Sequence, residues 1–201
     1  MPKIYSEAER NAIRQRLHEE ANSCLQQFGV KKTTVDMLVE RVGIPKGTFY
    51  LFYKSKELLL FEAIQDYHEQ IEQEMIQKCR KLGNELNVEN MTEIIVSGIL
   101  SVQNSCLKML MIPEQMDALI QKLPQEVVAE HLSHDEDLML QMLKGMPVRI
   151  GEKEGRTYSG AFRAIFFACM YHNEIGTENY EDSIGKLVKG LLIQIMEGKY
   201  D

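Results

Sequence analysis

The side chains of this sequence best suited to contacting another molecule are polar and basic, and they gather between residues 33 and 56. They are Thr33, Thr34, Lys46, Gly47, Thr48, Tyr50, Tyr53, Lys54 and Lys56. The phenol and ammonium groups of the tyrosines and lysines can donate hydrogen bonds to phosphate oxygens. Gly47 lets a backbone approach a ligand closely, and Thr48 can offer a hydroxyl and a methyl group to a base edge. These residue types favour a nucleic-acid contact over catalysis.

A pair of short helices is predicted to position these side chains. Thr33 and Asp36 have the spacing of a helix cap, and apolar residues follow them at helical spacing. Gly43 is suited to end that helix in a left-handed conformation, and Pro45 to begin a second helix that would run to about Tyr53. Two such helices form a helix-turn-helix, whose second helix enters the DNA major groove. The alternative is a helical hairpin with a solvated basic face and a buried aromatic side chain.

The same stretch resembles the DNA-binding segment of the TetR family of bacterial repressors, whose pattern is roughly T-T-x-x-I-A-x-x-A-G-V-S-K-G-T-x-Y-x-Y-F-x-S-K-E-x-L. The matching residues are Thr33, Thr34, Gly43, Lys46, Gly47, Thr48, Tyr50, Ser55, Lys56, Glu57 and Leu59. Phe52 and Tyr53 reverse the commoner Tyr-Phe order, which leaves open which ring is buried and which hydroxyl reaches phosphate. The resemblance covers about the first sixty residues.

The resemblance implies an all-α protein with two domains. Residues 1–54 would form a three-helix DNA-binding head, and residues 55–201 a helical body that binds an effector and dimerises. Helical periodicity predicts a first helix from the Ser6 cap to a point before Gly29, and a connector helix from Ser55 to Leu82, about 40 Å long. Beyond it the sequence predicts helices that start at Asn90, cover 114–122 and 125–146, and follow a loop at 147–155.

Charge and composition are compatible with this reading. The net charge is −7, but residues 1–60 hold 10 Lys and Arg against 7 Asp and Glu, whereas residues 61–201 hold 13 against 23. A basic head on an acidic body can bind DNA because phosphate contact depends on the local field. The first ten residues lack a signal-peptide core, and no run approaches the roughly 20 apolar residues of a membrane span. We therefore expect a cytoplasmic protein without a membrane partner.

The resemblance also implies a cavity for an unidentified small-molecule effector inside the helical body. The residues proposed to line it are Cys106, Met109, Met142, Tyr158, Phe162 and Phe166. Methionine is flexible and polarizable, which suits an adaptable apolar pocket. For any single methionine, filling a gap in the helical core is the preferred interpretation. The four cysteines are scattered in apolar helical contexts and are expected to be buried thiols.

Two C-terminal helices carry apolar faces wide enough for a four-helix interface between two subunits. The residues assigned to this homodimer interface are Phe167, Met170, Ile184, Leu187, Val188, Leu191, Leu192 and Ile195. One subunit could also cover such a stripe internally. The resemblance favours the dimer, because TetR-like proteins dimerise through their last two helices.

The remaining candidate chemistry is a cluster of histidines and carboxylates. His131 and His134 lie three residues apart with Asp135 and Asp137 beside them, a spacing that a metal site can use. A solvated helix face has the same pattern and is the preferred interpretation, so no metal or cofactor is predicted. No catalytic motif is present, and we expect no enzyme.

The sequence thus predicts a ligand-responsive transcriptional repressor that binds double-stranded operator DNA as a homodimer. The alternative is a helical small-molecule-binding or catalytic protein whose head makes protein contacts.

Overall fold

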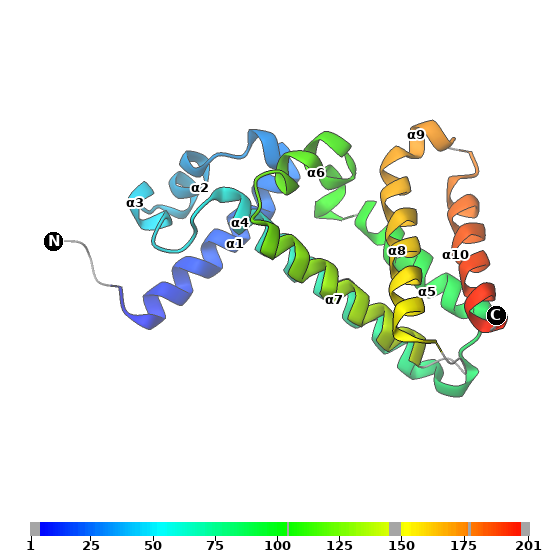
Figure 1. The fold of residues 1–201 in the computed structure, drawn as a ribbon. Helices are drawn as coiled ribbons and strands as arrows, with labels where there is room; N and C mark the ends of the chain where they lie inside the picture. Colours follow the sequence, from blue (N-terminus) through cyan, green and yellow to red (C-terminus); the bar gives the residue numbers. More distant parts are fainter. Residues whose placement is uncertain (1–4, 104, 145–149, 177, 198–201) are drawn as a thin grey trace. The chain divides into compact units, whose positions relative to one another are not determined.

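The computed structural model describes residues 5–103, 105–144, 150–176 and 178–197, and all regular structure in these residues is helical (Figure 1). This confirms the all-α fold class. The helices form two compact units. Unit 1 consists of the described residues up to His68 together with 105–123, and unit 2 of 69–103 and the described residues from Pro124 onward.

Unit 1 contains the predicted head and an additional segment. Its elements are α1 (Glu7–Lys32), α2 (Val35–Val42), α3 (Lys46–Phe49), the start of α4 (Lys56–Leu82), η2 (Cys106–Met111) and α6 (Pro113–Ile120). α1 packs against α2, and also against η2 and α6. Buried apolar side chains such as Leu17, Leu25 and Leu119 fill this unit. The head is therefore larger than residues 1–54, because a segment between α5 and α7 packs onto α1.

α1 begins as predicted, and Gly29 interrupts it at the point where the sequence predicted its end. The Ser6 hydroxyl accepts a hydrogen bond from the Glu9 amide at 3.3 Å, and the Glu9 carboxylate accepts one from the Ser6 amide at 2.8 Å. This reciprocal pair satisfies two amide groups that the first turn leaves free. Gly29 interrupts the helix with φ 70° and ψ −176°, a conformation almost restricted to glycine. The chain then resumes helical geometry up to Lys32.

Unit 2 is a helical bundle. It contains the rest of α4, η1 (Gly83–Glu85), α5 (Val88–Gln103), α7 (Gln125–Lys144), α8 (Glu152–Ala168), η3 (Cys169–Tyr171), α9 (His172–Ile175) and α10 (Tyr180–Glu197). α10 packs against α5 and α8, and α7 packs against α8. A Cβ atom on the buried Gly155 would lie 2.3 Å from Leu140 Cδ2, so glycine permits the close approach of α8 to α7.

The starts of two helices in unit 2 differ from the prediction. α5 starts at Val88 rather than at Asn90, because Asn87 and Asn90 exchange hydrogen bonds between each amide and the other side chain, at 2.9 and 3.0 Å. α8 begins at Glu152, inside the predicted loop, whereas 145–149 lie outside the described residues.

Across the described ranges, no helix combines the length and the apolar character that crossing a membrane requires.

Candidate nucleic-acid interface

The helix-turn-helix is present, with its first helix capped one residue later than predicted. The Thr34 hydroxyl accepts a hydrogen bond from the Met37 amide at 3.2 Å, and α2 follows from Val35. Thr33 is buried, and its hydroxyl donates to the Gly29 carbonyl at 2.6 Å. Thr33 therefore closes the end of α1, and Thr34 remains the threonine at the surface. Gly43 ends α2 in the left-handed conformation, as predicted.

The second helix is shorter than expected. α3 comprises Lys46–Phe49 only, although the backbone continues to turn, with the Leu51 amide donating to the Thr48 carbonyl at 3.1 Å and the Tyr53 amide to the Phe49 carbonyl at 3.0 Å. The fully buried Phe49 ring anchors this segment in the core of unit 1. The segment 46–54, α3 with the turns that follow it, is called the recognition segment below.

The recognition segment has one outward face. Its exposed residues recur at helical spacing and are Lys46, Gly47, Tyr50, Leu51 and Lys54. Thr48 and Tyr53, in contrast, are only 7% and 6% exposed. The Thr48 hydroxyl lies 3.2 Å from the Tyr5 hydroxyl, so it takes part in an internal hydrogen bond. Thr48 thus supports the segment from inside, and its hydroxyl does not lie on the outward face where a base edge was predicted to meet it.

The structure shows which of the two rings, Phe52 or Tyr53, is buried, a question that the sequence left open. Tyr53 is the buried ring, and its hydroxyl lies 3.0 Å from His18 Nε2. Burial, followed by the nearby Glu62 carboxylate, raises the pKa of Tyr53. Phe52 is half-buried beneath the Arg10 guanidinium, which lies 5.1 Å from the ring centroid. The tyrosine hydroxyl available to phosphate is therefore that of Tyr50, whose side chain is 52% exposed.

His18 connects three parts of unit 1. Its Nε2 atom also lies 3.0 Å from Glu62 Oε1, and its Nδ1 atom lies 3.0 Å from Asp66 Oδ2. The ring thus joins α1 to α4 and, through Tyr53, to the end of the recognition segment. Sequence reasoning missed this residue because its partners are 35 or more positions away in the chain.

Lys46 has a partner within the protein. Its Nζ atom lies 2.8 Å from Asp36 Oδ1 on α2, and both side chains are exposed. The hydrogen bond to Asp36 raises the pKa of Lys46 above its ordinary value. An exposed pair of this kind exchanges readily with solvent, so a phosphate or a base edge can compete for the ammonium group.

Lys56 is not available to a ligand in this arrangement. Its Nζ atom donates to the Val30 carbonyl at 2.7 Å and lies 3.3 Å from Glu57 Oε1, which Lys122 of unit 1 also approaches to 3.4 Å. Burial would raise the pKa of Glu57, but its backbone hydrogen bond and the two lysines outweigh that effect and hold the pKa below its ordinary value. Lys56 therefore fastens the start of α4 to α1, which corrects its assignment to DNA.

The residues proposed for the effector cavity do not belong to one unit. Met142, Tyr158 and Phe162 are buried in unit 2, and Phe166 is half-buried there. Met109 belongs to η2 in unit 1, and the side chain of Cys106 lies outside the described residues. The proposed residues that share unit 2 are therefore an apolar group on α7 and α8.

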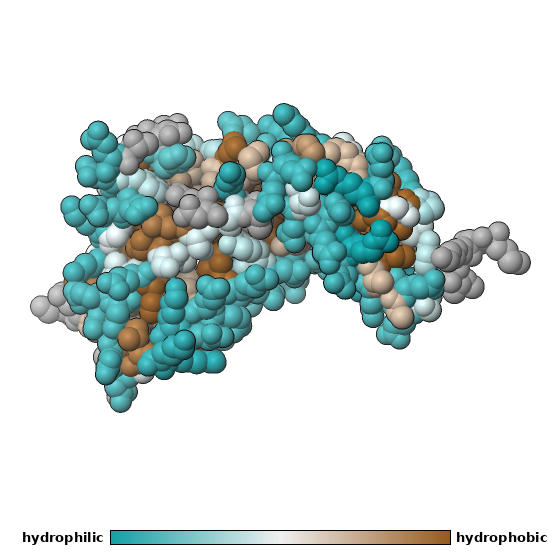
Figure 2. All heavy atoms as spheres, turned by 180° about the vertical axis from the view of Figure 1, so that it is seen from behind, coloured by the Kyte–Doolittle hydropathy of each residue, from teal (hydrophilic) through white to brown (hydrophobic). Residues whose placement is uncertain are grey.

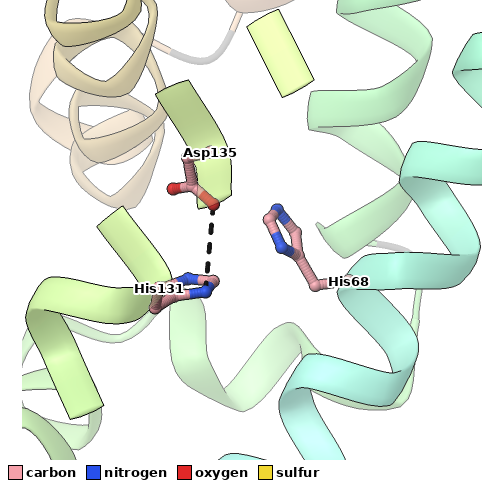
Figure 3. A group of neighbouring side chains, drawn as sticks. All are labelled: His68, His131 and Asp135. Atoms are coloured by element: carbon pink, nitrogen blue, oxygen red, sulfur yellow. Dashed lines mark ion pairs between the residues drawn. The ribbon is translucent and has the colours of Figure 1, made fainter. Parts of the chain in front are cut away.

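The two histidines of α7 have different carboxylate partners. His131 Nδ1 lies 3.8 Å from Asp135 Oδ1 one helical turn away, an ion pair that Figure 3 marks with a dashed line. His134 Nε2 instead lies 3.0 Å from Oε2 of the buried Glu72 on α4. This hydrogen bond raises the pKa of His134. Asp135 is also 3.9 Å from the Arg163 guanidinium. The cluster in unit 2 is thus a set of ion pairs between α4, α7 and α8.

The predicted dimer residues fall into two groups. Met170, Ile184, Val188, Leu192 and Ile195 are buried within unit 2, where α10 packs against α5 and α8. They are core residues of the subunit, and their assignment to the interface is corrected. Phe167 and Leu187, at 40% and 53% exposed, and the half-buried Leu191 remain at the surface. Figure 2 shows apolar surface among polar side chains on the side where α5 and α10 lie.

Comparison with known proteins agrees with this geometry. A sequence model of the family described as "Bacterial regulatory proteins, tetR family" matches residues 17–63. The uncharacterized HTH-type transcriptional regulator YhgD of Bacillus subtilis (strain 168) is 43% identical over 44 residues, which are 22% of this chain and 23% of that protein. The match therefore spans less than a quarter of that relative.

Solved structures extend the similarity to most of the chain. RolR, solved with the ligand resorcinol, is 15% identical with a TM-score of 0.64, and the match covers 93% of this chain and 90% of RolR. The TetR family repressor AlkX from Dietzia sp. strain DQ12-45-1b is 14% identical with a TM-score of 0.59, over 92% of this chain and 96% of AlkX. At these identities the structural similarity establishes the fold.

Proposed function

The chain belongs to the TetR family of bacterial regulatory proteins, and from this premise we propose that it is a dimeric transcriptional repressor, released from a near-palindromic operator by a small molecule. The single observation that carries the proposal is the outward face of the recognition segment. On it, Lys46, Gly47, Tyr50 and Lys54 are exposed, while Phe49 and Tyr53 hold the segment from inside. The family is one of regulators, not of enzymes.

Each head would place its recognition segment in a major groove of the operator. Two heads of a symmetric dimer would then meet half-sites about one helical turn apart, roughly 34–36 Å. Lys54, Tyr50 and the surface hydroxyl of Thr34 are proposed to contact phosphates and set the position of the head. Lys46 and Gly47 are proposed to approach base edges, after Lys46 exchanges its Asp36 partner for the DNA.

Dimerisation is proposed to use the surface of α8 and α10 that the subunit leaves uncovered. Phe167, Leu187 and Leu191 supply apolar area, and added Cβ atoms on Gly160 and Gly190 would meet nothing within 4 Å. Open glycine positions let helices of a second subunit approach closely. Two helices from each subunit would form a four-helix interface.

The effector is proposed to bind within unit 2, against the apolar group of Met142, Tyr158 and Phe162. Because the ligand would be buried between α7 and α8, its affinity would depend on how these helices pack. A ligand changes the DNA affinity only by its differential affinity for the DNA-binding and the released state.

The test is a fluorescence anisotropy titration of the purified protein with DNA from immediately upstream of its own gene, at two salt concentrations. The proposal expects tighter binding to this DNA than to a scrambled fragment of equal length, and weaker binding at the higher salt concentration. Equal affinity for both fragments, or no salt dependence, would contradict it and favour a head that contacts proteins.

A further inference from the structure

Leu51 is an apolar side chain that lies exposed on the outward face of the recognition segment. At 56% exposed, it is the most exposed large apolar residue of the described chain. It lies directly after α3, and its amide donates to the Thr48 carbonyl at 3.1 Å, which fixes the turn that carries it. Phe49 and Tyr53, two positions to either side, are both buried. The orientation of Leu51 is therefore set by the anchored residues around it.

The neighbours of Leu51 define the chemistry of its surface. The outward face of the recognition segment carries Lys46 and Lys54 at its two ends, with Tyr50 and Leu51 between them. Lysines attract the phosphate backbone, and a tyrosine can bridge apolar and polar surroundings. A partner that suits this face is anionic along its edges and presents an apolar group at its centre.

Duplex DNA offers one such group in the major groove, the C5-methyl of thymine. The edges of guanine, adenine and cytosine present hydrogen-bonding groups there, which a leucine side chain can neither donate to nor accept from. Burying such a donor or acceptor against leucine would cost free energy, whereas burying a methyl group is favourable. The side chain therefore discriminates between bases by apolar contact alone.

We infer that Leu51 reads a thymine in each half-site by packing against its C5-methyl group, an inference that rests on the proposed DNA-binding function. Lys54 and Tyr50 hold the recognition segment against the phosphate backbone of the DNA, and Leu51 contributes sequence preference without a hydrogen bond. Burial of one methyl-sized group corresponds to about a fourfold change in affinity.

The experiment removes the methyl group and the side chain separately. Once footprinting has located the operator, each of its thymines is replaced in turn by deoxyuridine, which lacks only the C5-methyl. Dissociation constants are measured for the wild type, Leu51→Ala, and the control Ile120→Ala, which shortens an exposed apolar side chain on α6. Leu51→Met keeps an apolar side chain of similar volume. It shows whether a loss of thymine preference in Leu51→Ala comes from the missing apolar contact or from misfolding.

The inference expects one thymine per half-site at which deoxyuridine weakens binding by the wild type and by Ile120→Ala about fourfold. At that position Leu51→Ala should bind thymine and deoxyuridine equally, and Leu51→Met should retain the preference. If Leu51→Ala weakens binding to both bases by the same factor, or if no thymine shows the coupling, Leu51 does not read the methyl group. Absence of sequence-selective binding by the wild type is a separate result, and it overturns the proposed function itself.

Discussion

Replacing Gly29 with alanine should destabilise unit 1 through two separable effects. Gly29 has φ 70° and ψ −176°, a region that an L residue with a Cβ atom rarely enters. The added Cβ atom would also lie 2.8 Å from Oε1 of Gln115 on α6. That oxygen accepts a hydrogen bond from the Lys31 amide at 3.1 Å, so moving the side chain away breaks a contact between α1 and α6.

The expected loss follows from these two effects. Backbone strain at such a conformation costs about 1–3 kcal/mol. Loss of the hydrogen bond between the Gln115 side chain and the Lys31 amide costs about 0.5–1.5 kcal/mol. We therefore expect Gly29→Ala to lower the free energy of unfolding by about 2–4 kcal/mol. Gln115→Ala alone removes only the hydrogen bond and should lower it by about 1 kcal/mol.

Urea denaturation of the wild type, the two single variants and the double variant separates the effects. All four are measured at one protein concentration, because dimerisation would make the apparent stability depend on it. The double variant should lose less than the sum of the single losses, since the same hydrogen bond is broken only once. It should still lose more than Gln115→Ala, because the strain at position 29 remains.

Two results would refute this reasoning. If the free energy of unfolding of Gly29→Ala is within about 0.5 kcal/mol of the wild-type value, position 29 carries neither the backbone strain nor the contact with Gln115. If Gln115→Ala restores the stability of Gly29→Ala completely, steric conflict is the whole effect and the backbone conformation is not strained.

Three further substitutions test the sites on the two units. His134→Gln should lower the free energy of unfolding more near pH 6 than near pH 9. The Glu72 hydrogen bond raises the pKa of His134. The stabilisation from protonated His134 is therefore complete below the ordinary pKa of 6.5 and is lost as the pH rises through the raised pKa. Thermal unfolding at both pH values measures this, and a cost that grows with pH would contradict it. Lys54→Ala should weaken binding to all DNA sequences and lower the salt slope by about 1, and an unchanged slope would exclude its phosphate contact. Leu187→Glu should shift the protein to monomer in sedimentation velocity, while Ile193→Glu, on another face of α10, should not; equal behaviour of the two variants would remove α10 from the interface.

Features fixed by neighbouring residues were predictable from the sequence. The Ser6–Glu9 capping box, the left-handed Gly43 and the length of α4 each follow from local spacing, and all three are present. The choice between Thr33 and Thr34 as the cap of α2 was not predictable. Either hydroxyl can cap a helix, and the carbonyl of Gly29 decides between them by binding Thr33.

Features that depend on distant packing could not be predicted. Helical periodicity identified α10 as amphipathic, but it could not show that packing against α5 and α8 buries Val188 and leaves Leu187 exposed. Nothing local indicates that α6 packs onto α1, or that His18 and not phosphate binds the Tyr53 hydroxyl. The most informative missed residue, Leu51, carried one signal. It is a leucine that follows Tyr50 in a segment with a lysine at either end, Lys46 and Lys54.

The central claim is that the outward face of the recognition segment binds DNA as one of a symmetric pair. Hydroxyl-radical footprinting on the upstream DNA tests it most directly, with Lys54→Ala as the comparison. We predict two protected patches related by a two-fold axis, centred about one helical turn apart, with protection reduced at both patches in the variant at equal protein concentration. A single unpaired patch, or protection that Lys54→Ala leaves unchanged, would contradict the claim.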